Sequence, residues 1–225
     1  MANVLDYIKW RGDLSVNQDG FNEVDGLILS RASYFPFESL MKEGETVTFR
    51  ELGERYSKLD PKKLNILWPD DVDLIPAMGS CKRFGEMQVT KYDHKIIKEK
   101  DIQYAAVTIL MPNDTIYVSY RGTDSTVVGW KEDLNMTFMT HVASQIEGVK
   151  YLEKVAKEFG DKKILVGGHS KGGNLSVYAS SSTASVISLI LVPSPFVYCW
   201  VMYIGTSNTF NPFNKISELL LFTTH

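Results

Sequence analysis

The stretch that decides the fold is Lys162-Lys-Ile-Leu-Val-Gly-Gly168-His-Ser170-Lys-Gly172-Gly-Asn-Leu-Ser-Val-Tyr-Ala179. Its first part, 162–168, is predicted to be a short buried strand, and 172–179 fits a helix despite its glycines. A G-x-S-x-G pentapeptide between a strand and a helix is typical of a nucleophile elbow, in which a strained turn projects the serine hydroxyl above the sheet. The sequence therefore predicts Ser170 as a nucleophile, with the backbone N–H of Lys171 as an oxyanion donor at the helix start.

Two other interpretations of this pentapeptide compete with a nucleophile elbow. A glycine-rich turn can serve packing alone, because glycines let a strand and a helix approach closely. A phosphate-binding loop is disfavoured, since the G-x-x-x-x-G-K-[ST] pattern is absent and G-x-G-x-x-G does not fit. The nucleophile interpretation is preferred because a predicted strand and a predicted helix flank the motif in the required order.

The segments before the pentapeptide predict a hairpin and a helix. Residues 104–111 and 115–120 flank Pro112-Asn-Asp114 and are expected to pair as antiparallel strands. Apolar residues then recur every three or four positions over 142–159, which predicts a helix with Gly160 as its C-cap.

Together these elements predict one domain over residues 1–225 with a parallel α/β core. The order helix, strand, sharp turn, helix, strand favours a mostly parallel central sheet with flanking helices. A helical N-terminal layer is expected over about 23–59, with Thr48 as an N-cap.

A second motif, Tyr120-Arg-Gly-Thr-Asp124, closes the second hairpin strand. A small polar residue after a glycine at a strand end can aim donors into a site above the sheet, so Thr123 is the other candidate for the oxyanion hole. An ordinary Gly-Thr-Asp turn or helix cap is the alternative. Arg121 and Asp124 are expected to orient the loop, and Trp130 and Asp133 to serve packing and loop support.

Composition excludes several classes of function. Lys and Arg number 24 against 27 Asp and Glu, a formal charge of -3 that gives no electrostatic reason to bind nucleic acid. Two cysteines, Cys81 and Cys199, form no disulfide framework and no zinc-spaced cluster, so neither a metal nor a cofactor is expected. Asp6 and Lys9 interrupt the apolar run that a secretory signal would need, which favours a cytoplasmic protein.

The last part of the chain has a different composition from the rest. After Lys171 the charged residues are Lys215 and Glu218 alone, and 186–204 is largely apolar. A buried strand over 186–192 followed by a turn at Pro193-Ser-Pro195 is one explanation. A membrane span or peripheral lipid contact is another, although Pro-Ser-Pro suits a helix interior poorly. A truncated or frame-shifted tail is the third.

Three motifs in order resemble a known family: Tyr120-Arg-Gly-Thr-Asp124, Gly129-Trp-Lys-Glu-Asp-Leu134 and Gly168-His-Ser-Lys-Gly-Gly-Asn-Leu175. They are similar to class 3 lipases, and more closely to an uncharacterised bacterial branch of lipase-like proteins. Proteins of that branch also have N-terminal motifs similar to residues 6–13 and 22–30 of this chain. The resemblance covers residues 1 to about 180, and leaves 183–225 as an atypical apolar tail. It implies an α/β-hydrolase core that hydrolyses carboxylic esters of acyl lipids.

A serine nucleophile needs a histidine base oriented by a carboxylate, and in this fold both follow the serine. After Ser170 the chain offers only Glu218 and His225, which are therefore the formal candidates for orienting acid and base. His169 is expected to contact the oxyanion loop or a neighbouring strand, and His94 and His141 to be solvated surface residues.

The missing base leaves two hypotheses for function. The first is a serine ester hydrolase of the lipase or esterase type. The second is a truncated or degenerate hydrolase relative that binds lipid or a protein partner without turnover.

Overall fold

The computed structural model describes residues 3–64, 66–160, 162–183, 192–193 and 199–204, the last two ranges by their backbone alone. The helices are α1 (Val4–Arg11), α2 (Glu23–Ala32), α3 (Phe37–Leu40), α4 (Phe49–Tyr56), α5 (Asp71–Ser80), α6 (Lys82–Gly85), α7 (Val127–Asn135), α8 (Ala143–Glu158) and α9 (Lys171–Ser182). The strands are β1 (Val47–Thr48), β2 (Gln88–Ile97), β3 (Ile102–Leu110), β4 (Thr115–Tyr120), β5 (Lys163–His169), β6 (Val192–Pro193) and β7 (Cys199–Ile204). Short 3₁₀ turns lie at Pro61–Lys63 and Lys98–Lys100.

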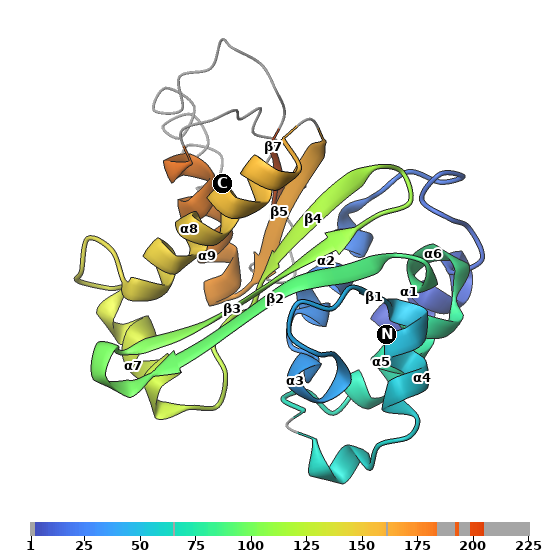
Figure 1. The fold of residues 1–225 in the computed structure, drawn as a ribbon, viewed down its shortest axis with the longest axis horizontal. Helices are drawn as coiled ribbons and strands as arrows, with labels where there is room; N and C mark the ends of the chain where they lie inside the picture. The colour runs from blue at the N-terminus through green and yellow to red at the C-terminus, as the bar shows by residue number, and fades with distance from the viewer. Residues whose placement is uncertain (1–2, 65, 161, 184–191, 194–198, 205–225) are drawn as a thin grey trace.

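The strands form one sheet in the order β1-β2-β3-β4-β5-β7-β6, with helices on both faces (Figure 1). This confirms the α/β class. The prediction of a mostly parallel sheet is wrong, because within the described residues only β4 and β5 pair in parallel. Short connections join β2 to β3 and β3 to β4, and such connections permit only antiparallel pairing. The parallel pair is joined by a long crossover through α7 and α8, as parallel strands require.

The two faces of the sheet carry separate cores, because alternate residues of each strand point to opposite sides. On one face, Val107, Tyr117 and Leu165 pack against the N-terminal helices. On the other face, Val118 and Val166 pack against α8 and α9. Figure 1 shows the same division, with α8 and α9 on one side and α1, α4 and α5 on the other.

Local predictions for the hairpin and for the helix after it are confirmed. β3 pairs antiparallel with β4 around the turn 111–114, where Asp114 has φ +62°. α8 covers the predicted helix over 142–159 to within about a residue at each end.

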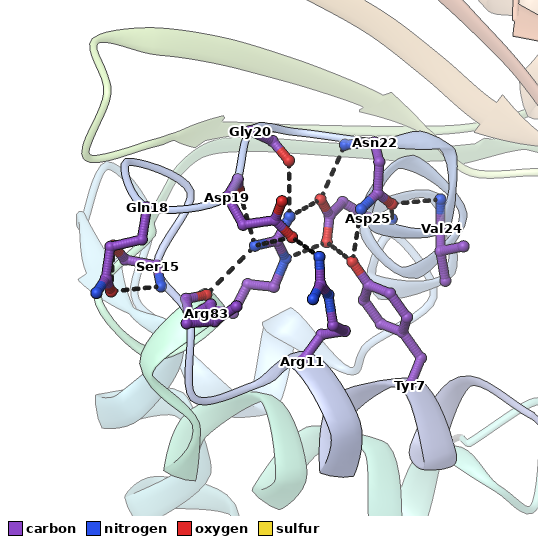
Figure 2. A network of polar contacts seen from close by, with 11 residues as sticks. Tyr7, Arg11, Ser15, Gln18, Asp19, Gly20, Asn22, Val24, Asp25 and Arg83 are labelled. Carbon is purple, nitrogen blue, oxygen red and sulfur yellow. Dashed lines mark hydrogen bonds and ion pairs between the residues drawn. The ribbon is translucent and has the colours of Figure 1, made fainter.

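The N-terminal layer is helical, and Thr48 caps α4 through a reciprocal bond with Glu51, as predicted. A buried guanidinium holds this layer together: Arg83 donates to both carboxylate oxygens of Asp25 and to the carbonyls of Leu14, Asp19 and Gly20 (Figure 2). Both side chains of the Arg83–Asp25 pair have an exposed fraction of 0%. The layer is therefore fixed by ionic bonds as well as by apolar packing.

The predicted strand over 186–192 lies almost entirely outside the described residues, so it stays a prediction. The backbone of β7 pairs antiparallel with β5, and that of β6 with β7. In the part of the chain that the structure describes, no helix combines the length and the apolar character needed to cross a membrane.

Candidate functional site

The turn between β5 and α9 holds Ser170 in a strained conformation. Its φ is +57° and its ψ is −124°, a region that L-residues with a side chain rarely adopt. The residue is exposed, whereas the strand that leads to it is buried. The hydroxyl therefore stands at the carboxyl end of β5 and at the start of α9, where the first N–H groups have no acceptor within the helix.

The glycines on either side of Ser170 allow this turn to form. A Cβ on Gly168 would overlap the backbone of Gly172, and a Cβ on Gly172 would overlap the carbonyl of Tyr120. These clashes involve backbone atoms, which cannot move aside cheaply. The pentapeptide glycines are thus required by the approach of α9 to the end of β4.

The loop after β4 lies directly against the serine. A Cβ built on Gly122 would lie 3.2 Å from the Cβ of Ser170. The next residue, Thr123, donates its hydroxyl to Asp133 Oδ2 at 2.5 Å, so that hydroxyl proton is already engaged. The backbone N–H of Thr123 is then the group that this residue can offer to an oxyanion.

The side chain of Lys171 forms a buried cluster behind the elbow. Its Nζ donates to Gln103 O at 2.7 Å, to Gln103 Oε1 at 2.6 Å and to Glu132 Oε2 at 2.9 Å. Glu132 also accepts the N–H groups of Gln103 and Ser144. Only 2% of the Lys171 side chain and 1% of the Glu132 side chain are exposed. All three ammonium protons have acceptors, so this lysine cannot serve as a base for Ser170.

A tyrosine and a tryptophan from the N-terminal layer cover the other side of the turn. The Tyr34 hydroxyl lies 3.0 Å from His169 Nδ1, and it lies so close to Gly122 that a Cβ added there would overlap it. The Trp68 ring meets His169 edge to face, and Arg31 lies 4.8 Å from the centroid of Trp68. Burial, and then the charge of Arg31, lowers the pKa of His169, which favours the neutral imidazole.

Ser170 has no hydrogen bond to a histidine within the described residues. His169 contacts the loop that contains Gly122 and Thr123, as its carbonyl lies beside Gly122. His94 is not a solvated surface residue, because its Nδ1 lies 2.8 Å from Glu38 Oε1 and its Nε2 is buried. It lies on β2, three strand spacings or roughly 14 Å from β5, which is too far to deprotonate Ser170. His141 is exposed, as expected.

The remaining candidates, Glu218 and His225, lie outside the described residues, and their roles as orienting acid and base stay predictions. Asp133 supports the loop through Thr123, in agreement with the sequence. Trp130 was expected to pack, yet 65% of it is exposed on the outer face of α7. The expectation failed because the periodicity of a short helix does not tell which side of it faces the sheet.

Sequence reasoning missed Tyr34, Gln103 and Glu132. They come from three separate elements, and nothing local in the sequence connects them to Ser170. The one available signal was Lys171 itself, a lysine between the glycines of a predicted buried turn, which requires a buried acceptor.

Among the described residues no group of three or more His, Cys, Asp or Glu side chains is placed to hold a metal ion. A family model described as Mbeg1-like matches residues 78–192, just over half of the chain. The matched region contains the loop at Gly122, the buried Lys171 cluster and the elbow. The searches of curated proteins and of solved structures found no match.

Proposed function

The chain belongs to the Mbeg1-like family, a lipase-like family, and from that premise we propose that it is a serine hydrolase that cleaves carboxylic esters of acyl lipids. The observation that carries the proposal is Ser170 at φ +57° between β5 and α9, with the Gly122 loop packed against it. This arrangement supplies a projecting hydroxyl beside two sets of backbone donors.

In the proposed reaction, Ser170 Oγ attacks the ester carbonyl carbon and loses its proton to a base. The carbonyl oxygen becomes an oxyanion, which the N–H groups of Thr123 and Lys171 stabilise. The tetrahedral intermediate then expels the alcohol, which takes up a proton, and leaves an acyl group on Ser170. Water hydrolyses this acyl-enzyme to the carboxylic acid and regenerates the serine.

An acyl lipid is the preferred substrate class because α7 carries exposed apolar residues next to the loop. Val127, Trp130 and Leu134 lie on this helix with exposed fractions of 83%, 65% and 66%. Their spacing of three and four positions puts them on one face of the helix. An apolar face beside an esterase site suits a substrate with a long hydrocarbon chain.

The test is intact-mass analysis after treatment with a fluorophosphonate probe, with Ser170→Ala alongside. A single adduct on the parent chain and none on Ser170→Ala is the expected result, because only an activated serine reacts with the probe. Loss of p-nitrophenyl ester turnover in the same variant is expected too. Equal labelling or equal turnover in the two proteins would refute the assignment of Ser170.

The second candidate function is a hydrolase relative that binds lipid or a protein partner without turnover. It is favoured by one observation: among the described residues, Ser170 makes no hydrogen bond to a histidine. It predicts a folded chain that takes up no fluorophosphonate and binds acyl-lipid vesicles equally well with and without Ser170→Ala.

A further inference from the structure

We infer that Gln103, held by the buried Lys171–Glu132 ion pair, orients the peptide group that presents the oxyanion donor of Thr123. This inference rests on the proposed function, and it assigns a positioning role to three side chains that do not touch the substrate.

The first step of the argument is the direction of one peptide bond. The side-chain amide of Gln103 donates its Nε2–H to the carbonyl oxygen of Gly122 at 3.3 Å, within the buried interior. The carbonyl of Gly122 and the N–H of Thr123 belong to the same peptide group, which is trans. In a trans peptide the two groups point in opposite directions. Fixing the carbonyl inward therefore turns the Thr123 N–H outward.

The second step is the position of that peptide group. Gly122 lies against Ser170, as the 3.2 Å separation of its added Cβ from the serine Cβ shows. The Thr123 side chain is held separately by Asp133, the neighbour of Glu132 on α7. The peptide between Gly122 and Thr123 is thus fixed on one side by Gln103 and on the other by Asp133.

The third step is what fixes Gln103. Its backbone N–H donates to Glu132 Oε2 at 3.1 Å, and both its oxygens accept from Lys171 Nζ. The backbone N–H, the backbone carbonyl and both ends of the side-chain amide of Gln103 are all hydrogen-bonded. The amide therefore cannot rotate without breaking its bond to the charged ammonium of Lys171. Lys171 is also the first residue of α9, directly after Ser170. One ammonium group therefore links the serine turn to the loop that faces it.

Energetics give a reason to ascribe a function to this pair. A buried ion pair is often no more stabilising than apolar residues of similar volume, so burial of Lys171 and Glu132 does not by itself explain a stable fold. The pair does specify geometry, because the three ammonium protons of Lys171 meet their three acceptor oxygens in only one arrangement.

The decisive variant is Gln103→Met, which keeps the side-chain volume but removes the amide that holds the Gly122 carbonyl. Tyr151→Phe is the matched control, since it removes from α8 a buried hydroxyl that bonds Thr108 on β3 and the Lys91 carbonyl on β2. Two readouts are compared: kcat and KM for a p-nitrophenyl acyl ester, and backbone hydrogen exchange across 121–126.

In Gln103→Met we expect kcat to fall roughly 10- to 100-fold with KM within about twofold of the parent value, because the donor acts mainly on the developing oxyanion. Exchange across 121–126 should become faster, while Tyr151→Phe should match the parent in both readouts. An unchanged kcat, or equal exchange across the loop in all three proteins, would overturn the inference. If the parent chain has no turnover, the proposed function fails, and the exchange readout alone still decides whether Gln103 holds the loop.

Discussion

Two buried cations support different regions of this molecule, and they do so with different chemistry. Arg83, in the N-terminal layer, spreads its guanidinium over Asp25 and the carbonyls of a loop, as a planar group with five donors can. Lys171, at the elbow, directs three protons to two residues, Gln103 and Glu132. The first cation fixes a scaffold loop, whereas the second fixes Gln103, which bonds the carbonyl of Gly122 beside Ser170.

The location of the partners of each cation indicates whether its network supports stability alone or also the reactivity of Ser170. The Arg83 partners lie in the N-terminal layer, on α2 and in the loop before it (Figure 2). The Lys171 partners lie on β3 and α7, and one of them, Gln103, bonds the carbonyl of Gly122 next to Ser170. Damage to the Arg83 network should therefore lower stability alone, and damage at Lys171 should lower both stability and the reactivity of each folded molecule.

The largest expected effect is that of Asp25→Ala. It leaves the Arg83 guanidinium fully buried without its carboxylate, which costs about 3–5 kcal/mol in the free energy of unfolding. Urea denaturation followed by circular dichroism measures the loss. The fluorophosphonate labelling rate per folded molecule should stay at the parent value; a lower rate would mean that the two regions are coupled.

The pair Arg31–Asp71 tests the contact between the N-terminal layer and the site, because Arg31 also lies over Trp68 beside His169. Burial raises the pKa of Asp71 from its ordinary value of 3.8 to about 6. The folded state then binds this proton more tightly than the unfolded chain does. The contribution of Asp71 is therefore most favourable below about pH 4 and is lost as the pH rises to about 6, by roughly 3 kcal/mol.

Urea unfolding at pH 4.5 and pH 7, with Asp71→Asn alongside, isolates this carboxyl from the other groups that titrate. The parent should lose more unfolding free energy than the variant between the two values of pH. The same pH dependence in both proteins would show that Asp71 is solvated.

At the elbow, Lys171→Met leaves the Glu132 carboxylate buried with two backbone donors, at a cost of about 3 kcal/mol, the low end for a broken buried pair because those donors remain. Adding Glu132→Gln removes the uncompensated charge, so the double variant should regain part of that stability. Labelling of Ser170 should remain slow in both. Recovery of labelling together with stability would contradict the positioning role of the pair.

The smallest expected effect separates two glycines, one in each region. Gly172→Ala forces a methyl group against the Tyr120 carbonyl, which costs about 1–3 kcal/mol and displaces the serine turn. Gly20→Ala meets nothing within 4 Å of the added Cβ and should change stability by less than about 0.5 kcal/mol. Thermal unfolding of both variants, with labelling of Ser170, makes the comparison.

Local features of this fold were predictable from sequence, and long-range ones were not. The strained serine turn, the hairpin and the Thr48 cap each depend on residues within a few positions of one another. Strand direction is set by connections and partners elsewhere in the chain, so the mostly antiparallel sheet was missed. β2 was missed too, because its polar residues cover a half-exposed strand and resemble a loop.

The residues of the candidate site also divide into local ones that the sequence predicted and long-range partners that it did not. Gly122 and the glycines around Ser170 identify the site, since neighbouring atoms leave no room for a Cβ at these positions. The partners of Lys171 did not show in the sequence, because a buried ion pair needs two residues that only the folded chain brings together. The same holds for Arg83 and Asp25 in the N-terminal layer, a buried ion pair that the sequence did not predict either.

The parallel pairing of β4 with β5 has a consequence for the order of folding. β2, β3 and β4 are joined by short turns and can pair early, whereas Tyr120 meets Gly168 only after the chain has closed a loop that contains α7 and α8. Closing a long loop costs entropy before its contacts form, which slows the pairing. Ser170 and the Gly122 loop therefore meet late in folding, and a chain whose hairpin is already formed still lacks its site.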